Sequence, residues 1–244
     1  MTTSGTSSFN LDLNNIIEES FERCGSELRT GYDLRTARRS LNLLTIEWAN
    51  RGINLWTLEQ IEIPLVQGQI TYDLPVDTID LLDQVVRTGT GQNQTDINIS
   101  RISESTYITI PNKNATGRPI QVWVNRQSGA AYPDGLLPPG VEIKYPQINV
   151  WPAPDQSDFY TFVAYRLRRI EDAGEGGTRT QDIPFRFLPA MVAGLAYYLS
   201  LKIPGAMERT EFLKAEYEQA YQLAAEEDRE KAPVRFVPRT MFYR

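Results

Sequence analysis

The chain has 244 residues and a net charge of −6, with 41% hydrophobic and 23% charged residues, which suits one large domain or two modest ones. It contains no histidine and one cysteine, Cys24, so histidine-dependent nucleophiles, histidine-ligated metals, internal disulfides and CxxC sites are excluded. The acidic balance argues against a basic-patch binder of nucleic acid or anionic membranes. We expect Cys24 to be a small buried hydrophobe.

Two amphipathic helices are predicted after a polar segment, residues 1–8, that should be disordered. The first spans Asn10 to Cys24, with Asn10 or Asp12 as its cap. The second begins with a cap at Asp33, runs through Ala49 and ends at Gly52. Its apolar residues recur at spacings of three and four on one face: Leu34, Ala37, Leu41, Leu44 and Trp48. The other side carries Arg35, Arg38, Arg39, Asn42 and Glu47.

From Gln60 the hydrophobic period changes from helical to two, which predicts an antiparallel β region. Turn-rich stretches separate its short segments, and Ser103–Ile108 is expected to form a short helical turn. The predicted strands are Gln60–Val66, Gln69–Leu74, Leu82–Thr88, Ile97–Ile102, Ile120–Asn125, Val141–Tyr145, Gln147–Trp151 and Phe159–Arg168.

A third helix is predicted from Pro184 to Lys202 and is apolar on nearly every side. Such a helix must be covered on every side, so it is either central in its own bundle or packed against a neighbouring subunit as well. We expect Ala193, Gly194 and Tyr197 to form an oligomer seam. The apolar run here is shorter than the about 20 residues of a membrane span, and no membrane partner is expected.

The fourth helix, Met207–Lys231, places Leu213, Tyr217, Ala220 and Ala224 on one face and is followed by a basic, aromatic arm. Pro233 and Pro238 prevent the helix from continuing. An arm with this composition has no core of its own to enter, so we expect it to order on a partner. Its predicted binding residues are Arg235, Phe236, Arg239, Phe242, Tyr243 and Arg244.

These elements predict the α+β class: a four-helix bundle formed by both chain ends, an inserted antiparallel β domain and an extended C-terminal arm. The expected bundle comprises residues 9–58 and 183–231, and the β domain comprises residues 59–172. Residues 173–182 are expected to be a linker, and residues 232–244 form the arm.

No catalytic, cofactor-binding or metal-binding residue is predicted, although two alternatives to a structural role stay open. A glycan hydrolase would need a pair of carboxylates across a cleft. The candidates are Glu18 and Glu19; Asp77, Asp80 and Asp83; and Glu226, Glu227 and Asp228. A carbohydrate-binding module could use Trp123 or Trp151 as a stacking platform, whereas Trp48 is expected in the core. The basic run Arg166–Arg169 is expected to pair with acidic helix ends.

The ordered set of segments resembles the head-to-tail adaptor proteins of short-tailed bacteriophages, also called tail accessory or tail tubular A proteins. The matching segments are ARRSLNLLTIEWANRGINLW (37–56), IEIPLVQGQITYDLP (61–75), INVWPAPD (148–155), FLPAMVAGLAYYLSLKIPG and LKAEYEQAYQLAAEEDRE (within 187–230). Together they cover most of the chain in the family's order.

This resemblance implies a structural protein that forms a dodecameric ring in the virion, between the portal protein and the tail nozzle or tube. DNA would pass through the centre without sequence-specific binding, and an acidic body suits that passage because it repels phosphates. The protein would be made in the cytoplasm of the bacterial host. The arm would bind a neighbouring subunit or, preferably, the portal ring.

Overall fold

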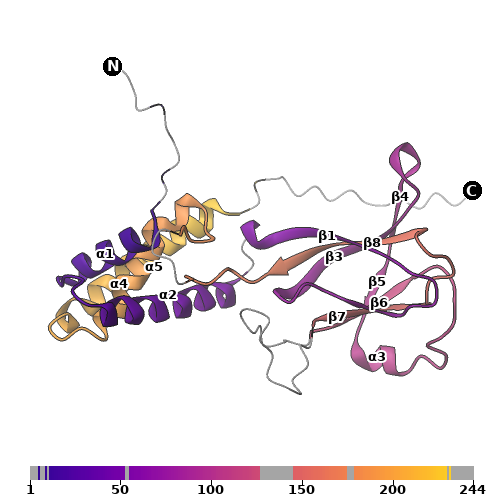
Figure 1. Cartoon of the computed structure of the whole chain (residues 1–244), viewed down its shortest axis with the longest axis horizontal. Coiled ribbons are helices and arrows are strands. Elements are labelled where there is room, and N and C mark those ends of the chain that lie inside the picture. Colours follow the sequence, from indigo (N-terminus) through magenta and orange to yellow (C-terminus); the bar gives the residue numbers. More distant parts are fainter. Residues whose placement is uncertain are drawn as a thin grey trace, which may run out of the picture. The chain divides into compact units, whose positions relative to one another are not determined.

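The computed structural model of the chain describes residues 5, 9, 11–52, 55–126, 145–174, 179–229 and 231. Its contacts divide the chain into two compact units, one from Met1–Leu55 and Glu171–Arg244 and the other from Trp56–Ile170. The first unit is helical and the second consists mainly of β-strands (Figure 1). The protein therefore belongs to the mixed α+β class, as predicted.

Two helices from the N-terminal part begin at side-chain caps. In α1 (Leu13–Cys24) the Asp12 carboxylate accepts the Asn15 amide at 2.8 Å, and Gly25 ends the helix in the left-handed region at φ 75°. For α2 (Gly31–Arg51) the cap is Thr30 and not Asp33 as expected. Asp33 instead completes a capping box by accepting the Thr30 amide at 3.1 Å.

The apolar helix α4 (Leu188–Ser200) packs against α1, α2 and α5 (Thr210–Glu227). Short 3₁₀ turns, Phe185–Phe187 and Met207–Arg209, precede α4 and α5, so both helices are shorter than predicted. Nine of the thirteen α4 residues are buried. Helix α4 is therefore the central helix of the helical unit, which was one of the two arrangements expected for an all-round apolar helix.

The second unit contains two four-stranded sheets, ordered β1-β8-β3-β4 and β2-β7-β6-β5. The first sheet is antiparallel, whereas the second contains a parallel pair, β5 with β6, that the sequence did not predict. The strands are β1 (Leu58–Pro64), β2 (Thr71–Asp73), β3 (Thr78–Thr88), β4 (Thr95–Asn98), β5 (Ser100–Ile102), β6 (Gln121–Asn125), β7 (Gln147–Trp151) and β8 (Tyr160–Arg168).

The two sheets share one apolar core. Strand β6 contributes Val122 and Val124, β7 contributes Ile148 and Val150, and β8 contributes Phe162. These are alternate residues along their strands, because successive side chains of a strand point to opposite faces. The short helix α3 (Glu104–Ile108), capped by the Ser103 hydroxyl, lies where a helical turn was predicted.

Other differences between the predicted and the observed elements concern where the elements begin and end. One strand was predicted over Ile97–Ile102, but the chain forms β4 and β5 there, with buried Ile99 between them. The strand predicted over Val141–Tyr145 lies almost wholly outside the described residues, as do the segment 1–8 and the arm 232–244.

Candidate interaction surfaces

A partly buried polar network holds three helices of the helical unit in place. The Trp48 indole N–H of α2 donates to the Tyr217 hydroxyl of α5 at 2.9 Å, and that hydroxyl donates to Glu47 at 3.2 Å. Tyr198 of α4 donates to the other oxygen of Glu47 at 2.6 Å. Arg51 joins Glu47 to Glu218 of α5 at 2.5 and 2.7 Å. Every member therefore has a partner, which makes such a network stabilising.

Burial and neighbouring charges shift the pKa values of several side chains in this network. Desolvation, together with the hydrogen bond to Glu47, raises the pKa of Tyr198 to about 12. Desolvation likewise raises the pKa of Tyr217 far above its ordinary value. The hydrogen bond from Arg51 lowers the pKa of Glu218. Both phenols therefore stay neutral donors at physiological pH.

The structure places two of the predicted seam residues inside the helical unit. Ala193 is fully buried, and a Cβ added to Gly194 would lie 2.9 Å from Leu44 and from Tyr217. Gly194 therefore permits close packing between helices of one chain. Tyr197 is only half-buried and stacks on Tyr217. A role in a subunit seam remains a prediction, and for Ala193 and Gly194 it would have to be indirect.

Cys24 is buried, as predicted, and its thiol donates to the Ala196 carbonyl at 3.1 Å. Desolvation, only partly offset by Arg209, raises the pKa of Cys24 to about 11. The thiolate that a nucleophile needs is therefore scarce at neutral pH.

The carboxylates considered for hydrolysis mostly have structural partners. Asp228 is buried, pairs with Arg186 at 2.5 Å and accepts the Leu55 amide at 3.1 Å. Asp80 pairs with Arg101 at 2.7 Å. For Asp77, desolvation acts to raise the pKa, but hydrogen bonding and the charge of Arg166 hold it below its ordinary value. Carboxylates that are paired in this way stabilise the fold.

The expectation that the basic run Arg166–Arg169 pairs with acidic helix ends was wrong for its buried member. That member, Arg166 of β8, pairs with Glu59 of β1 at 2.5 Å and with Asp77 at 2.6 Å. Asp77 lies in the turn before β3. The sequence could not show this, because only the register of β8 between β1 and β3 brings these side chains together.

The tryptophans are held by their own unit. Trp48 is fully buried, as predicted. Trp123 stacks on Tyr107 of α3 with ring centroids 5.0 Å apart, and Trp151 donates its indole N–H to the Asn112 carbonyl at 3.0 Å. Both are half-buried, so neither presents a fully open ring face for sugar stacking.

Large apolar side chains are exposed on the outer faces of the helical unit. The sequence predicts one apolar face for α2, but Tyr32, Leu43 and Ile46 lie on the opposite side of this helix and are 64%, 53% and 57% exposed. Helix α5 exposes Phe212 and Leu223. The available signal was the spacing of three between Leu43 and Ile46, which the stronger buried stripe obscured. Exposed apolar residues in groups indicate contact surfaces.

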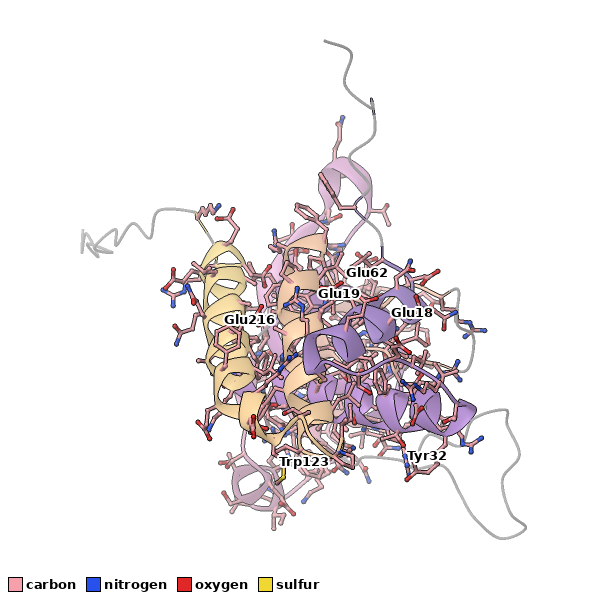
Figure 2. All side chains as sticks on the ribbon, turned by 90° about the vertical axis from the view of Figure 1, so that its left-hand side faces the viewer. Glu18, Glu19, Tyr32, Glu62, Trp123 and Glu216 are labelled. Carbon is pink, nitrogen blue, oxygen red and sulfur yellow. The ribbon has the colours of Figure 1, made fainter. Side chains whose placement is uncertain are left out.

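The surface of the helical unit also has two grooves. One, of about 450 Å³, runs between α1 and the start of α4 and is lined by acidic and apolar side chains. The other, of about 870 Å³, lies between α2 and the end of α4 and includes Tyr32, Arg39 and Leu43. Figure 2 shows Glu18 and Glu19 of the first groove and Tyr32 of the second at the surface of the helical unit.

Within the part of the chain that the structure describes, no group of three or more acidic or cysteine side chains could hold a metal ion. No described helix is long and apolar enough to span a membrane. The six predicted arm residues, Arg235, Phe236, Arg239, Phe242, Tyr243 and Arg244, lie outside the described residues.

A family model described as "SU10 adaptor protein" matches residues 12–239, which is nearly the whole chain. The match includes both compact units. No curated protein matches the chain.

Proposed function

Because the chain belongs to the SU10 adaptor protein family, we propose that it is a structural adaptor of a bacteriophage virion that joins the head to the tail. The observation that carries this proposal is the family match over residues 12–239. The resemblance of segments 37–56, 61–75, 148–155 and 187–230 to the head-to-tail adaptors of short-tailed phages agrees with it.

In this proposal, copies of the chain form a ring, with twelve as the expected number from the resemblance. The portal protein binds on one side and the tail nozzle or tube on the other, and DNA passes through the central channel. The net charge of −6 supports passage without retention, because acidic walls repel phosphates. The ring would act in the virion after synthesis in the bacterial cytoplasm, without a cofactor.

Each part of the chain would have a separate task. The four long helices, expected as a bundle from residues 9–58 and 183–231, would build the ring. The β domain (59–172), attached through the linker (173–182), would face a tail protein or the ring exterior. The arm (232–244) would bind the portal through its arginine and aromatic side chains. Simultaneous engagement by every subunit would multiply the affinity of the joint.

The two rival functions gain little from the site geometry. A hydrolytic acid needs a carboxyl group whose pKa is raised, yet Asp77, Asp96, Glu218 and Glu227 all have lowered pKa values. A sugar platform needs an open ring face, whereas Trp123 stacks on Tyr107.

Native mass spectrometry of the full chain, with and without the portal protein from the same phage, tests the adaptor role. We expect a closed homo-oligomer that binds the portal ring. A chain that binds neither portal nor tail proteins and releases sugars from cell-wall material would contradict the proposal.

A further inference from the structure

The outer face of α2 is both apolar and basic along most of the helix. Exposed Tyr32, Arg35, Arg39, Leu43 and Ile46 follow one another at spacings of three or four residues, which places them on one side of the helix. That side contains no acidic residue. Among the described residues, neither Arg35 nor Arg39 has a carboxylate partner, so this α2 face has two unpaired cations beside exposed apolar side chains.

The α1–α4 groove has the complementary composition. Its apolar floor includes Leu188, Pro189 and Val192, and its rim carries Glu18, Glu19 and Glu22. Glu19 already pairs with Arg23 at 3.0 Å. Glu18 and Glu22 are exposed and have no ion-pair partner in the described part of the chain. The groove therefore presents apolar surface with unpaired negative charge beside it.

These two surfaces lie on different sides of one helical unit. Helix α4 packs against both α1 and α2, and Figure 1 shows α1 and α2 on opposite sides of it. In Figure 2 Glu18 and Glu19 likewise lie well away from Tyr32. One copy cannot bring its own α2 face to its own groove, whereas two copies can.

We propose that the α2 face of one copy binds the α1–α4 groove of the next copy, and that this contact repeats from subunit to subunit. Leu43 and Ile46 would cover the apolar floor, while Arg35 and Arg39 would meet Glu18 and Glu22. This is the helix-in-groove mode of recognition, with charges fixing the register. The inference deepens the proposed function by assigning the contact that would build the ring.

The charges of the two surfaces also determine which symmetry the contact between copies can have. A two-fold contact between two α2 faces would bring arginine against arginine, and a contact between two grooves would bring glutamate against glutamate. Only a contact between the α2 face of one copy and the α1–α4 groove of another joins opposite charges. Such a contact is heterologous, because it uses two different surfaces. Heterologous contacts generate rings when the rotation closes, as an adaptor ring requires.

A nucleic acid is the other ligand to consider, because Arg35 and Arg39 could hold phosphates. However, Leu43 and Ile46 expose more than half of their surface on the same face, and backbone binding of duplex DNA gives such side chains nothing to cover them. The exposed apolar side chains favour a protein partner.

The test compares full-length variants by sedimentation velocity at low and high salt. Arg39→Glu and Glu18→Arg should each weaken self-association about 100-fold, since juxtaposed like charges cost several kcal/mol. An equimolar mixture of the two variants should restore assemblies containing both at a ratio of one to one, because unlike charges then meet at every contact. Lys214→Glu and Glu211→Arg, exposed charge reversals on α5, serve as controls and should leave assembly unchanged.

Several outcomes would overturn the assignment. A wild type that stays monomeric, a loss caused by only one of the two variants, or a mixture that fails to recover would each exclude this contact. Loss of binding to a short DNA duplex in Arg39→Glu, with assembly intact, would make the face a phosphate site. Circular dichroism melting verifies that the variants fold. None of these outcomes removes the adaptor role, which portal binding tests separately.

Discussion

Trp48 and Tyr217 are 169 residues apart in the sequence, yet the indole N–H of one donates to the hydroxyl of the other at 2.9 Å. Both side chains are buried, at 0% and 1% exposure. The bond joins a helix from the N-terminal part of the chain to one from the C-terminal part. It therefore makes the stability of the helical unit depend on both chain ends.

Tyr217→Phe should destabilise the helical unit by about 1–3 kcal/mol, because it leaves the buried Trp48 N–H without an acceptor. Urea unfolding followed by tryptophan fluorescence measures the loss. Tyr32→Phe is the matched control, since Tyr32 is 64% exposed, and it should change stability by less than about 0.5 kcal/mol. Equal midpoints for both variants would mean that the bond contributes nothing.

Gly194→Ala should also destabilise the protein, although alanine favours helix over glycine by about 1 kcal/mol. The added Cβ would lie 2.9 Å from Leu44 and from the Tyr217 ring, and overpacking of a buried site costs about 1–3 kcal/mol. Gly31→Ala in the first turn of α2 meets no atom within 4 Å and should be neutral or slightly stabilising. Thermal melting compares the two, and a Gly194→Ala protein that melts above Gly31→Ala would contradict this packing.

Because the Tyr198 phenol loses its proton at high pH, the free energy of unfolding should decrease in alkaline solution. The folded pKa of Tyr198 is raised to about 12 by desolvation and by Glu47, from an ordinary value of 10.0. The folded state therefore binds the phenolic proton more tightly than the unfolded state does. The stabilisation that this difference gives is complete below pH 10 and is lost as the pH rises from about 10 to 12. In Tyr198→Phe the decline of the unfolding free energy over that interval should be shallower. Parallel declines in both proteins would refute the assignment.

Cys24 should resist thiol reagents in the folded protein. Its burial and raised pKa of about 11 leave little accessible thiolate at neutral pH. A disulfide reagent at pH 8 should label the native chain slowly and label it fully in urea, with Cys24→Ser as the blank. Rapid stoichiometric labelling without denaturant would show that α1 and α4 open at this point.

The helices were predictable because their apolar residues follow a single period. Leu41, Leu44 and Trp48 are all buried, and the all-round apolar character of α4 correctly allowed a central position. Helix starts were less accessible, because Thr30 and Asp33 both suit a cap and only the bond geometry distinguishes them. Local pattern thus determines which segments become helices better than where they begin.

The pairings between distant residues could not be read from the sequence. Arg166 meets Glu59 and Asp77 only because β8 lies between β1 and β3, and the parallel pairing of β5 with β6 likewise depends on the sheet order. On α2, the polar side of the pattern contained Leu43 and Ile46 as well as arginines. From the sequence alone, a residue on the polar face of a helix is taken to be solvated. Its exposed area and its neighbours in the structure are needed to recognise a contact surface there.

The last prediction concerns the arm that follows Lys231. Its two prolines, Pro233 and Pro238, restrict the unbound chain, so less backbone entropy is lost on binding than for a flexible segment. Three arginines and three aromatic residues supply the anchor types that dominate interfaces. Truncation after Lys231 should leave the melting temperature almost unchanged and severely weaken attachment to the portal.

Charge reversal of Arg235, Arg239 and Arg244 should weaken that attachment as well, and more strongly at low salt, where unscreened charges act over longer distances. Reversal of Lys214 and Arg229, exposed at the surface of the helical unit, is the control, because it changes the net charge in the same direction outside the arm. Surface plasmon resonance on immobilised portal rings measures both. If the truncated chain bound the portal with undiminished affinity, the arm would be passive, and the portal contact would have to be made by the helical unit or the β unit.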